Sequence, residues 1–491
     1  MHMMTREEKY RLIEQARPGE LAQLRDQVER SPWRQSYHIQ APTGLLNDPN
    51  GFSYYQGEYH LFYQWFPLGT EHGMKYWYHT KSSNLAVWEG LGIGIAPGGP
   101  YDSHGAYSGS AIEKDGQLYM MYTGNTRDEA WTRHPYQCLA SMDADGRIVK
   151  LNRPVISSVP PGYTDHFRDP KVWKSGKDYY CVIGAQRTDL TGCAVLYRSE
   201  DLLDWTFMGE MKSGLSPFGY MWECPDYFEL DESGVLIFSP QGLQADGDLY
   251  NNIYQTGYVI GQPLDLSTGE FRHGAFRELD RGFDFYAAQT TQGPDGRRIL
   301  VAWMGLPDVA YPTDTHGWSG CLTIPRQLTI QGGNKLIQQP VPELAKLRKT
   351  QSGATLTLKD EVKHLNGFDG TSYELICEIS MFDAEELGLE FRASGHEKTV
   401  LKYDTGQKKI ILDRTFSGQA MDEINGNIRR CGFNADRLKF HLFVDTSSVE
   451  IFINDGEEVF TSRIFPDPAS KEIRLFCSGG TAEFRVCKWD I

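Results

Sequence analysis

Short apolar runs separated by turn residues dominate the sequence from about residue 34 onward. The runs are rich in Val, Ile, Tyr and Phe, and many follow a turn signal such as Asp115-Gly116 or Asp295-Gly296. This pattern predicts β-strands joined by hairpins. The clearest predicted strands cover residues 59–63, 118–122, 179–183, 235–239 and 299–303. The chain is therefore expected to be all-β.

The pattern differs before residue 31, where apolar positions follow one helical face among charged residues. These positions are Tyr10, Ile13, Leu21, Leu24 and Val28. We predict a helical segment over residues 5–30, ended by Ser31-Pro32 because proline cannot continue a helix. We expect this segment to lie as a structural strap over part of the following domain.

A weak internal repeat points to the architecture of that domain. The pattern Ser-x-x-Leu-x-x-Trp occurs at residues 82–88 and again at 199–205, each time between two strand-like runs. Small repeated β units suggest the blades of a propeller. We expect Trp88 and Trp205 to pack between sheets and not to bind a ligand.

Composition shifts at residues 331–350, where Gly332-Gly333, Pro340 and Pro342 resemble a linker. Beyond it, strand patterns alternate more cleanly, and 454–456 is a hairpin turn, which is typical of a β-sandwich. The later strands are predicted at 354–358, 373–379, 387–391, 439–444, 449–453 and 473–476. The predicted divisions are a helical segment at 1–32, a β-propeller at 33–335, a linker at 336–350 and a β-sandwich at 351–491.

The net charge and the distribution of cysteines exclude several classes of partner and of binding site. Lys and Arg number 49 against 65 Asp and Glu, so the formal net charge is −16. Such a surface repels nucleic acid and anionic membranes, and neither is an expected partner. The nine cysteines are scattered without a C-x-x-C pair, which predicts neither a disulfide framework nor a zinc site. With no apolar run long enough for a membrane span or a signal peptide, we predict a cytoplasmic protein.

Three short segments carry carboxylates in a turn or strand-end setting. Asp48 follows two leucines in a turn cluster, Asp169 stands beside Arg168, and Glu223 lies between Trp222 and Cys224. Each has an ordinary alternative: a turn residue bonding its own backbone, a surface ion pair, or a strand-edge glutamate in water. Glu223 is the most informative, because an apolar setting would raise its pKa and suit a general acid.

Taken together, three carboxylates in one repetitive domain favour glycoside hydrolysis. That reaction needs a nucleophile or base and an acid, and a third carboxylate can bind sugar hydroxyls. Sequence spacing does not place these groups in space, so the residues alone leave retention and inversion of configuration both open.

The segments that carry these carboxylates resemble those of glycoside hydrolase family 32, the invertases and other β-fructofuranosidases. The matching segments occur in the family's order, at 47–51, 64–67, 107–110, 168–170, 223–226, 284–287 and 303–305. The resemblance implies a five-bladed β-propeller followed by a β-sandwich, and retaining hydrolysis of a β-fructofuranosyl bond without metal or cofactor. It implies that Asp48 is the nucleophile, that Glu223 is the general acid and then the base, and that Asp169 stabilises the transition state with Arg168 beside it. The fructose pocket that it implies contains Asn47, Gln64, Trp77, Tyr107, Ser108, Tyr286 and Trp303.

Some positions depart from the commoner family pattern. Leu46, His72 and Tyr78 stand where other residue types are usual, and Leu45-Leu46 and His72-Gly73 resemble the bacterial intracellular branch, the sucrose-6-phosphate hydrolases. That likeness implies cleavage of sucrose 6-phosphate, and also of sucrose, to glucose 6-phosphate or glucose and fructose. A phosphate needs a local cationic pocket, for which the candidates are His72, Lys75, Arg127, Arg133 and His134.

Three alternatives remain open from sequence. An intracellular invertase or a fructan-trimming β-fructofuranosidase would differ only in the aglycone site. A propeller arabinan or xylan hydrolase would lack the 47–51 segment. A non-catalytic sugar-binding protein would be expected to lose Asp48 or Glu223, and both are present. The expected partner is a small sugar, with the chain a monomer or a homodimer.

Overall fold

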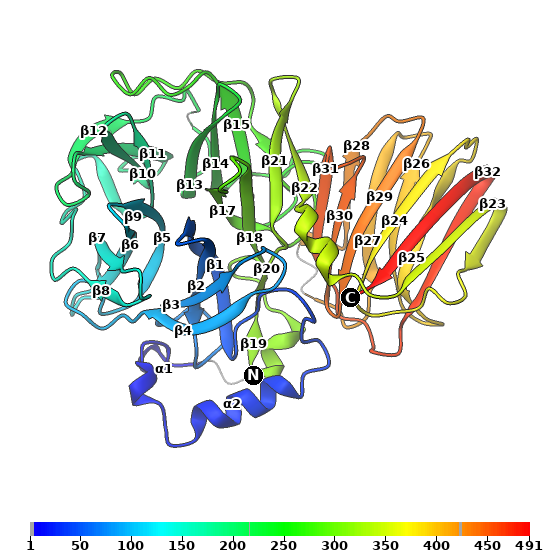
Figure 1. Cartoon of the computed structure of the whole chain (residues 1–491), viewed down its shortest axis with the longest axis horizontal. Helices are drawn as coiled ribbons and strands as arrows, with labels where there is room; N and C mark the ends of the chain where they lie inside the picture. The colour runs from blue at the N-terminus through cyan, green and yellow to red at the C-terminus, as the bar shows by residue number, and fades with distance from the viewer. Residues whose placement is uncertain (1–3, 216, 422–424) are drawn as a thin grey trace.

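The computed structural model describes residues 4–215, 217–421 and 425–491. Two β domains lie side by side along the long axis of the molecule, and the N-terminal helices run along one end of the first domain (Figure 1). The first domain is a five-bladed propeller and the second a β-sandwich in which one sheet folds over on itself. The predicted fold class is confirmed.

Each propeller blade has four antiparallel strands in chain order. The bounds are β1 (Gly44–Tyr55), β2 (Glu58–Phe66), β3 (Tyr76–Ser82) and β4 (Glu89–Ile95); β5 (Ala106–Lys114), β6 (Gln117–Arg127), β7 (Arg133–Met142) and β8 (Ile148–Lys150); β9 (Tyr163–Ser175), β10 (Asp178–Arg187), β11 (Gly192–Ser199) and β12 (Thr206–Glu210); β13 (Met221–Leu230), β14 (Ser233–Gln241), β15 (Gly257–Gly261) and β16 (Arg277–Glu278); β17 (Tyr286–Gln292), β18 (Arg298–Met304), β21 (Arg326–Gln331) and β22 (Lys335–Pro340). The five apolar runs read from the sequence fall in β2, β6, β10, β14 and β18, the second strand of each blade.

The innermost strands β1, β5, β9, β13 and β17 contact one another in turn, and β17 also contacts β1, so the ring is closed. Two short strands strengthen this closure: β19 (Trp318–Ser319) pairs with β1 and β20 (Cys321–Leu322) pairs with β18. The short helix η2 (Pro312–His316) precedes them. The last blade is thus tied to the first.

The Ser-x-x-Leu-x-x-Trp repeat marks the turn between the third and fourth strands of the first and third blades. Leu85 and Leu202 have φ of 61° and 74°, and their carbonyls accept hydrogen bonds from Trp88 Nε1 (2.9 Å) and Trp205 Nε1 (3.0 Å). Both tryptophans are half-buried, and each packs against a hydrophobic cluster that includes residues of two neighbouring blades. The repeat is therefore a turn motif of the blades.

The boundary predicted after the propeller needs correction. Strand β22 runs through Pro340 and pairs with β21, so the first five residues of the predicted linker belong to the fifth blade. Gly332 and Gly333 both have positive φ and form the hairpin turn between these strands. Glycines that allow a tight turn were mistaken for a flexible connection. The connection itself is the short helix η3 (Pro342–Leu347).

The N-terminal segment is also not one continuous helix. It contains α1 (Arg6–Lys9), η1 (Ile13–Gln15) and α2 (Glu20–Glu29). Pro18 lacks an amide hydrogen, and Gly19 takes a left-handed conformation (φ 79°) at the start of α2. Together they break the helix that the apolar pattern suggested.

The described residues of the second domain form ten strands in one sheet. They are β23 (Gln351–His364), β24 (Tyr373–Ser380), β25 (Glu386–Ala393), β26 (Lys398–Asp404), β27 (Lys409–Phe416), β28 (Ile428–Gly432), β29 (Leu438–Asp445), β30 (Ser448–Ile453), β31 (Glu458–Arg463) and β32 (Glu472–Asp490). The long strand β32 pairs with β24, β25 and β23, which lets the sheet fold over a single hydrophobic core. The predicted turn at 454–456 joins β30 to β31.

A buried ionic network joins the two domains. Arg326 in the propeller donates to Glu450 Oε2 (2.6 Å) and lies 3.1 Å from Asp280. His38 lies between Asp445 Oδ2 (2.8 Å) and Glu450 Oε1 (3.0 Å) of the sandwich. Because buried charges are costly unless paired, these contacts fix how the domains dock. No helix in the described part of the chain is long and apolar enough to cross a membrane.

Candidate active site

A cavity of about 350 Å³ opens at one end of the propeller ring and contains the three predicted carboxylates. Asp48 comes from β1, Asp169 from β9 and Glu223 from β13, which belong to three different blades. The cavity therefore joins segments that are far apart in sequence.

A β-bulge recurs at this level of every innermost strand. In each blade, two residues of the first strand oppose a single residue of the second, as the pairing on either side of the bulge shows. The bulged pairs are 47–48, 107–108, 169–170, 224–225 and 287–288. Bulges bend a strand and change the direction of its side chains. This repeated irregularity explains why the chemical groups gather at one end of the channel.

Asp48 is held by donors on both oxygens. Asn47 Nδ2 donates to Oδ1 (3.1 Å) and Ser108 Oγ donates to Oδ2 (2.5 Å). Burial raises the pKa of Asp48, and the charge of Glu223 adds to this, whereas the donors and Lys75 oppose it. The carboxylate is thus fixed in one rotamer with its charge supported by hydrogen bonds.

Asp169 has a left-handed backbone (φ 66°) and is almost completely buried. Its Oδ2 accepts a hydrogen bond from the Cys224 amide (3.0 Å), and its own amide donates to Thr123 Oγ1 (3.0 Å). Burial raises the pKa of Asp169 to about 7, although the Arg168 charge opposes that shift. A non-glycine residue with positive φ at such a place is a strained geometry typical of functional sites.

Glu223 does not lie in the apolar setting that the sequence predicted. Its Oε1 accepts from Arg168 Nη2 (2.7 Å) and Nε (3.0 Å), and its Oε2 accepts from Gln241 Nε2 (2.8 Å) and Tyr286 Oη (2.5 Å). The expectation was wrong because flanking apolar residues in a strand point elsewhere, and the glutamate itself faces the polar channel.

Most of the predicted binding residues line the cavity with the carboxylates. They are Asn47, Gln64, His72, Lys75, Tyr107, Arg168, Tyr286 and Trp303. Trp77 and Ser108 do not. Trp77 is fully buried and donates from Nε1 to the Tyr107 carbonyl (3.0 Å), whereas Ser108 lies behind Asp48. Both support residues that line the cavity.

The phosphate candidates lie at different places in the structure. Lys75 is buried, and its Nζ donates to Asn47 Oδ1 (2.6 Å). Burial lowers the pKa of Lys75 to about 7, with the Asp48 charge opposing. Arg127 and Arg133 line the cavity from the ends of β6 and β7, whereas His134 is exposed, lies 3.0 Å from Asp128 and does not line it. Lys75 therefore belongs to the group around the nucleophile candidate.

Four further residues that line the cavity were not predicted: Tyr10, Gln241, Pro307 and Asp308. Gln241 ends β14 and reaches Glu223 across the blade, a contact set by strand register. Tyr10 was assigned to the helical face of a strap, and only the folded path of residues 4–16 shows it at the cavity. No local sequence signal marks these four positions.

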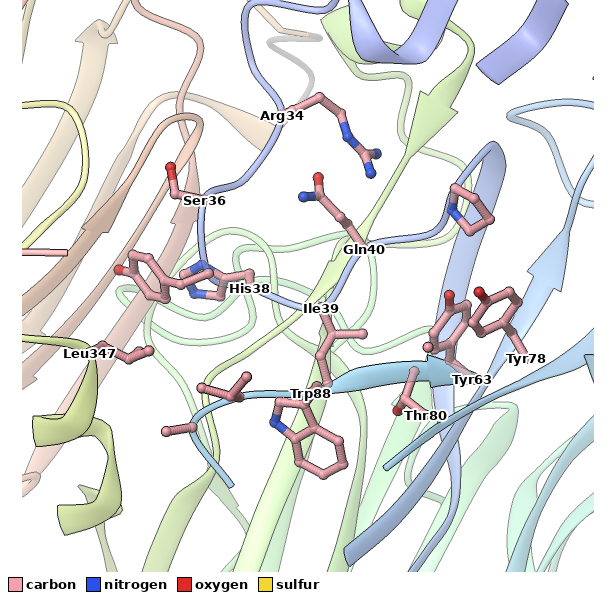
Figure 2. Close-up of a pocket in the computed structure, with 15 residues that line it drawn as sticks. Arg34, Ser36, His38, Ile39, Gln40, Tyr63, Tyr78, Thr80, Trp88 and Leu347 are labelled. Atoms are coloured by element: carbon pink, nitrogen blue, oxygen red, sulfur yellow. The ribbon is translucent and has the colours of Figure 1, made fainter. Parts of the chain in front are cut away.

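A second cavity, of about 450 Å³, lies between the first blade, the segment 34–42 and Leu347 at the end of η3 (Figure 2). Arg34 and Gln40 extend into it, and the rings of Tyr63 and Tyr78 stack with centroids 5.1 Å apart. No carboxylate lines it. It therefore lacks the groups that glycoside chemistry requires.

Comparison with known proteins agrees with the geometry. The model of the glycosyl hydrolases family 32 N-terminal domain matches residues 38–340, and the model of the family 32 C-terminal domain matches residues 343–490. This chain belongs to glycosyl hydrolase family 32. Among the residues described, no three His, Cys, Asp or Glu side chains are grouped so that they could hold a metal ion.

Family 32 relatives match nearly the whole chain. A sucrose-6-phosphate hydrolase of Staphylococcus xylosus is 45% identical over 491 residues, covering 100% of this chain and 99% of the relative. One from Bacillus subtilis (strain 168) is 44% identical, covering 94% of both. The structure of sucrose-6-phosphate hydrolase from Lactobacillus gasseri has a TM-score of 0.93 at 39% identity, covering 100% of this chain and 99% of that one. A Bombyx mori GH32 beta-fructofuranosidase mutant in complex with sucrose has a TM-score of 0.82 at 35% identity, covering 95% and 96%.

Proposed function

We propose that this enzyme hydrolyses the β-fructofuranosyl bond of sucrose 6-phosphate with retention of configuration, releasing glucose 6-phosphate and fructose. Sucrose is expected to be a second, poorer substrate. The observation that carries the proposal is the meeting of Asp48, Asp169 and Glu223 in one cavity of a family 32 propeller. The full-length likeness to sucrose-6-phosphate hydrolases supports the choice of substrate.

Asp48 acts as the nucleophile. Its oxygens already accept hydrogen bonds from Asn47 and Ser108, so attack on the anomeric carbon needs little reorganisation of the carboxylate. A retaining glycosidase forms a covalent glycosyl ester at this step. The nearby Lys75, bonded to Asn47, supplies positive charge beside the carboxylate and helps to keep it ionised.

Glu223 acts as the acid that protonates the leaving oxygen and then as the base that activates water. Arg168 holds one of its oxygens and Tyr286 and Gln241 hold the other. In the substrate complex the departing glycosidic oxygen would bind at Oε2, in competition with the Tyr286 and Gln241 donors. The donors fix the carboxyl group so that one residue can perform both proton transfers.

Asp169 binds fructose hydroxyls and stabilises the positive charge that develops on the sugar ring. Its Oδ2 accepts a hydrogen bond from the backbone amide of Cys224, which holds the side chain in one rotamer. The remaining cavity residues are proposed to line the pocket that binds the fructose unit. These are Asn47, Gln64, Tyr107, Arg168, Tyr286 and Trp303.

The function is tested by measuring fructose release from sucrose 6-phosphate, sucrose and inulin with the wild-type enzyme. A higher kcat/KM for sucrose 6-phosphate supports the proposal. Equal values for the first two substrates would instead identify an invertase without phosphate preference, and faster release from inulin would identify a fructan-trimming enzyme. If the wild-type enzyme released fructose from none of the three substrates, the assignment as a fructosidase would be contradicted.

The catalytic roles are tested by azide rescue. Glu223→Ala should lose at least about 100-fold in turnover of sucrose, and azide should restore cleavage of an activated aryl fructoside with a β-fructosyl azide as product. Asp48→Ala with azide should give the α-azide, because azide then replaces the nucleophile itself. A β-azide from Asp48→Ala, or near wild-type turnover by Glu223→Ala, would overturn these roles.

The same proposal places the enzyme in the cytoplasm. All nine cysteines are unpaired thiols, which suits a reducing compartment. A phosphorylated disaccharide is too polar to cross a lipid bilayer unaided. Cell fractionation with an antibody against the protein would check the location.

A further inference from the structure

Two arginines at the cavity lack a counter-ion within the described chain. Arg127 and Arg133 are directly opposite each other in the β6–β7 ladder, and both line the cavity. No carboxylate of the described residues forms an ion pair with either one, and the Nε of each is buried without a hydrogen-bond partner. Like charges placed opposite each other in a ladder are destabilising. Arg127 Nη1 donates to the Trp131 carbonyl (3.2 Å) and the charge of Asp165 acts on Arg133 without forming an ion pair, so the fold compensates the repulsion of this pair only in part.

Burial lowers the pKa of Arg133, and the positive charges of Arg168 and Arg127 add to that effect. The Arg133 guanidinium still carries its charge at neutral pH, because the ordinary pKa of an arginine lies far above this range. A dianionic ligand in the cavity would offset the mutual repulsion and act as the counter-ion of both guanidinium groups. Planar guanidinium groups bind phosphate in a bidentate manner.

The N-terminal segment, residues 4–16, contacts two loops beside the same cavity. The Met74 amide donates to the Lys9 carbonyl (2.7 Å), the Ile13 amide donates to Tyr76 Oη (2.8 Å), and Lys9 pairs with Glu71 (2.5 Å). The Arg6 guanidinium lies over the ring of Trp131, 4.2 Å from its centroid. The segment thus connects the loop at 67–75 with the loop at 128–132.

Tyr10 is the residue through which this segment enters the cavity. Its ring packs against His104 and Trp131, with centroids 5.3 Å away in each case. Burial raises the pKa of Tyr10 to about 12, and the neighbouring Tyr107 adds to the shift, so the hydroxyl stays a neutral donor. The positive charges of Arg127 and Arg133 are close enough to act on the Tyr10 hydroxyl, and they oppose the rise in its pKa. A phenol donor and two guanidinium groups therefore share one end of the cavity.

We propose that Tyr10, Arg127 and Arg133 form the subsite that binds the phosphate group of the substrate, and that residues 4–16 position it. The inference rests on the proposed function and identifies which residues give it its phosphate preference. In sucrose 6-phosphate the phosphate is on glucose C6, several bonds from the scissile oxygen. It cannot therefore reach the nucleophile's surroundings, where Lys75 is already bonded to Asn47. The local cations also counter the −16 net charge that would otherwise repel a dianion.

The test compares the ratio of kcat/KM for sucrose 6-phosphate to kcat/KM for sucrose. Arg133→Met should lower this ratio by about 100-fold and Tyr10→Phe by about 10-fold, the range expected for hydrogen bonds to a charged group. The kcat/KM for sucrose should change less than about 3-fold in both, since sucrose has no group for this subsite. Tyr10→Phe keeps the ring packing and removes only the hydroxyl.

Matched controls are Arg147→Met and Tyr101→Phe. Arg147 is an exposed arginine of the same blade, and Tyr101 packs against Tyr136; neither lines the cavity. Both should keep the wild-type ratio. Inorganic phosphate, used as a competitive inhibitor of sucrose 6-phosphate hydrolysis, should bind about 10-fold more weakly to Tyr10→Phe and Arg133→Met than to the controls.

The outcomes distinguish this inference from the proposed function. If the wild-type enzyme prefers sucrose 6-phosphate while Tyr10→Phe and Arg133→Met keep that preference and their phosphate inhibition, the subsite lies elsewhere and the inference is overturned. If only Arg133→Met loses preference, the role of residues 4–16 is overturned. A wild-type enzyme without any phosphate preference would overturn the substrate assignment itself.

Discussion

The backbone amide of Cys224 donates to Oδ2 of Asp169 at 3.0 Å, so the segment with the proposed acid directly holds the proposed transition-state stabiliser. The thiol of the same residue lies 3.6 Å from that oxygen and 3.8 Å from Oδ2 of Asp48. Cys224 has a left-handed backbone (φ 48°) in the bulge of β13. One bulged residue thus links all three carboxylate segments.

This position predicts an unreactive thiol. Burial and the charges of Asp169, Asp48 and Glu223 raise the pKa of Cys224 well above its ordinary value. Because the thiolate is the reactive form, iodoacetamide at pH 8 should leave activity nearly unchanged over an hour. Mass spectrometry should show Cys224 unmodified in the native enzyme and alkylated after denaturation. Rapid inactivation with label on Cys224 would contradict the prediction.

Ser108→Ala should weaken the nucleophile without unfolding the blade. The hydroxyl donates to Asp48 Oδ2, and this bond lowers the pKa of that carboxyl against the effect of burial. Its loss should cut kcat/KM about 10-fold at pH 7 and move the acid limb of the pH profile to higher pH. Ser110→Ala in the same strand is the control, because its hydroxyl donates to the Pro170 carbonyl instead. An unchanged acid limb would exclude this role.

The sequence predicted the fold through the second strand of each blade. Those strands are buried on both faces and read as continuous apolar runs, as 235–239 does in β14. The innermost strands were less visible because they carry polar site residues and a bulge that breaks their alternation. Asp48 in β1 was therefore recognised by its motif and not by any strand pattern.

The sequence predicted the site residues that belong to local motifs. It did not predict the residues that only the tertiary structure brings to the cavity. The motif residues Asn47, Asp169 and Tyr286 all reach the cavity. The sequence could not show that Trp77 is buried beside Tyr107 and does not line the cavity, since tertiary packing decides that. Tyr10 was missed because residues 4–16 reach the cavity by a path that no periodicity records.

Lys75→Met should lower turnover of both substrates together. The ammonium group is bonded to Asn47, its pKa is lowered by burial to about 7, and it faces Asp48. Its loss should reduce kcat/KM for sucrose and sucrose 6-phosphate by similar factors of about 10 or more, leaving their ratio within about 3-fold of wild type. A selective loss of activity on sucrose 6-phosphate would instead make Lys75 a phosphate ligand, as the sequence suggested.

Glu223→Gln should shift the acid limb of the residual activity to lower pH. The charge of Glu223 raises the pKa of Asp48, so a neutral amide should let Asp48 ionise at lower pH. The measurement uses an aryl fructoside whose leaving group needs no protonation, with kcat/KM followed from pH 3 to 8. Because the carboxylates titrate as a group, the limb reports their shared apparent pKa. A limb that stays in place would show that the two charges do not interact.

His38 should make the stability of the domain interface depend on pH. Burial disfavours its charged form, but the hydrogen bonds and charges of Asp445 and Glu450 outweigh this and raise the pKa of His38 to about 9. The folded pKa lies above the unfolded value of about 6.5, so the stabilisation is complete below pH 6.5 and is lost as pH rises through 9. Its size is on the order of 3 kcal/mol.

The variant His38→Gln tests this dependence, since glutamine can bond to a carboxylate but carries no charge. The thermal midpoint of the wild type should exceed that of the variant most at pH 6, and the gap should narrow steadily between pH 7 and pH 9. Arg326 pairs with the same Glu450 in both proteins, so a pH-dependent change that the two proteins share is common background. A gap that is constant from pH 6 to 9 would mean that folding leaves the pKa of His38 unchanged, and a gap that widens with rising pH would mean that His38 is neutral in the folded protein.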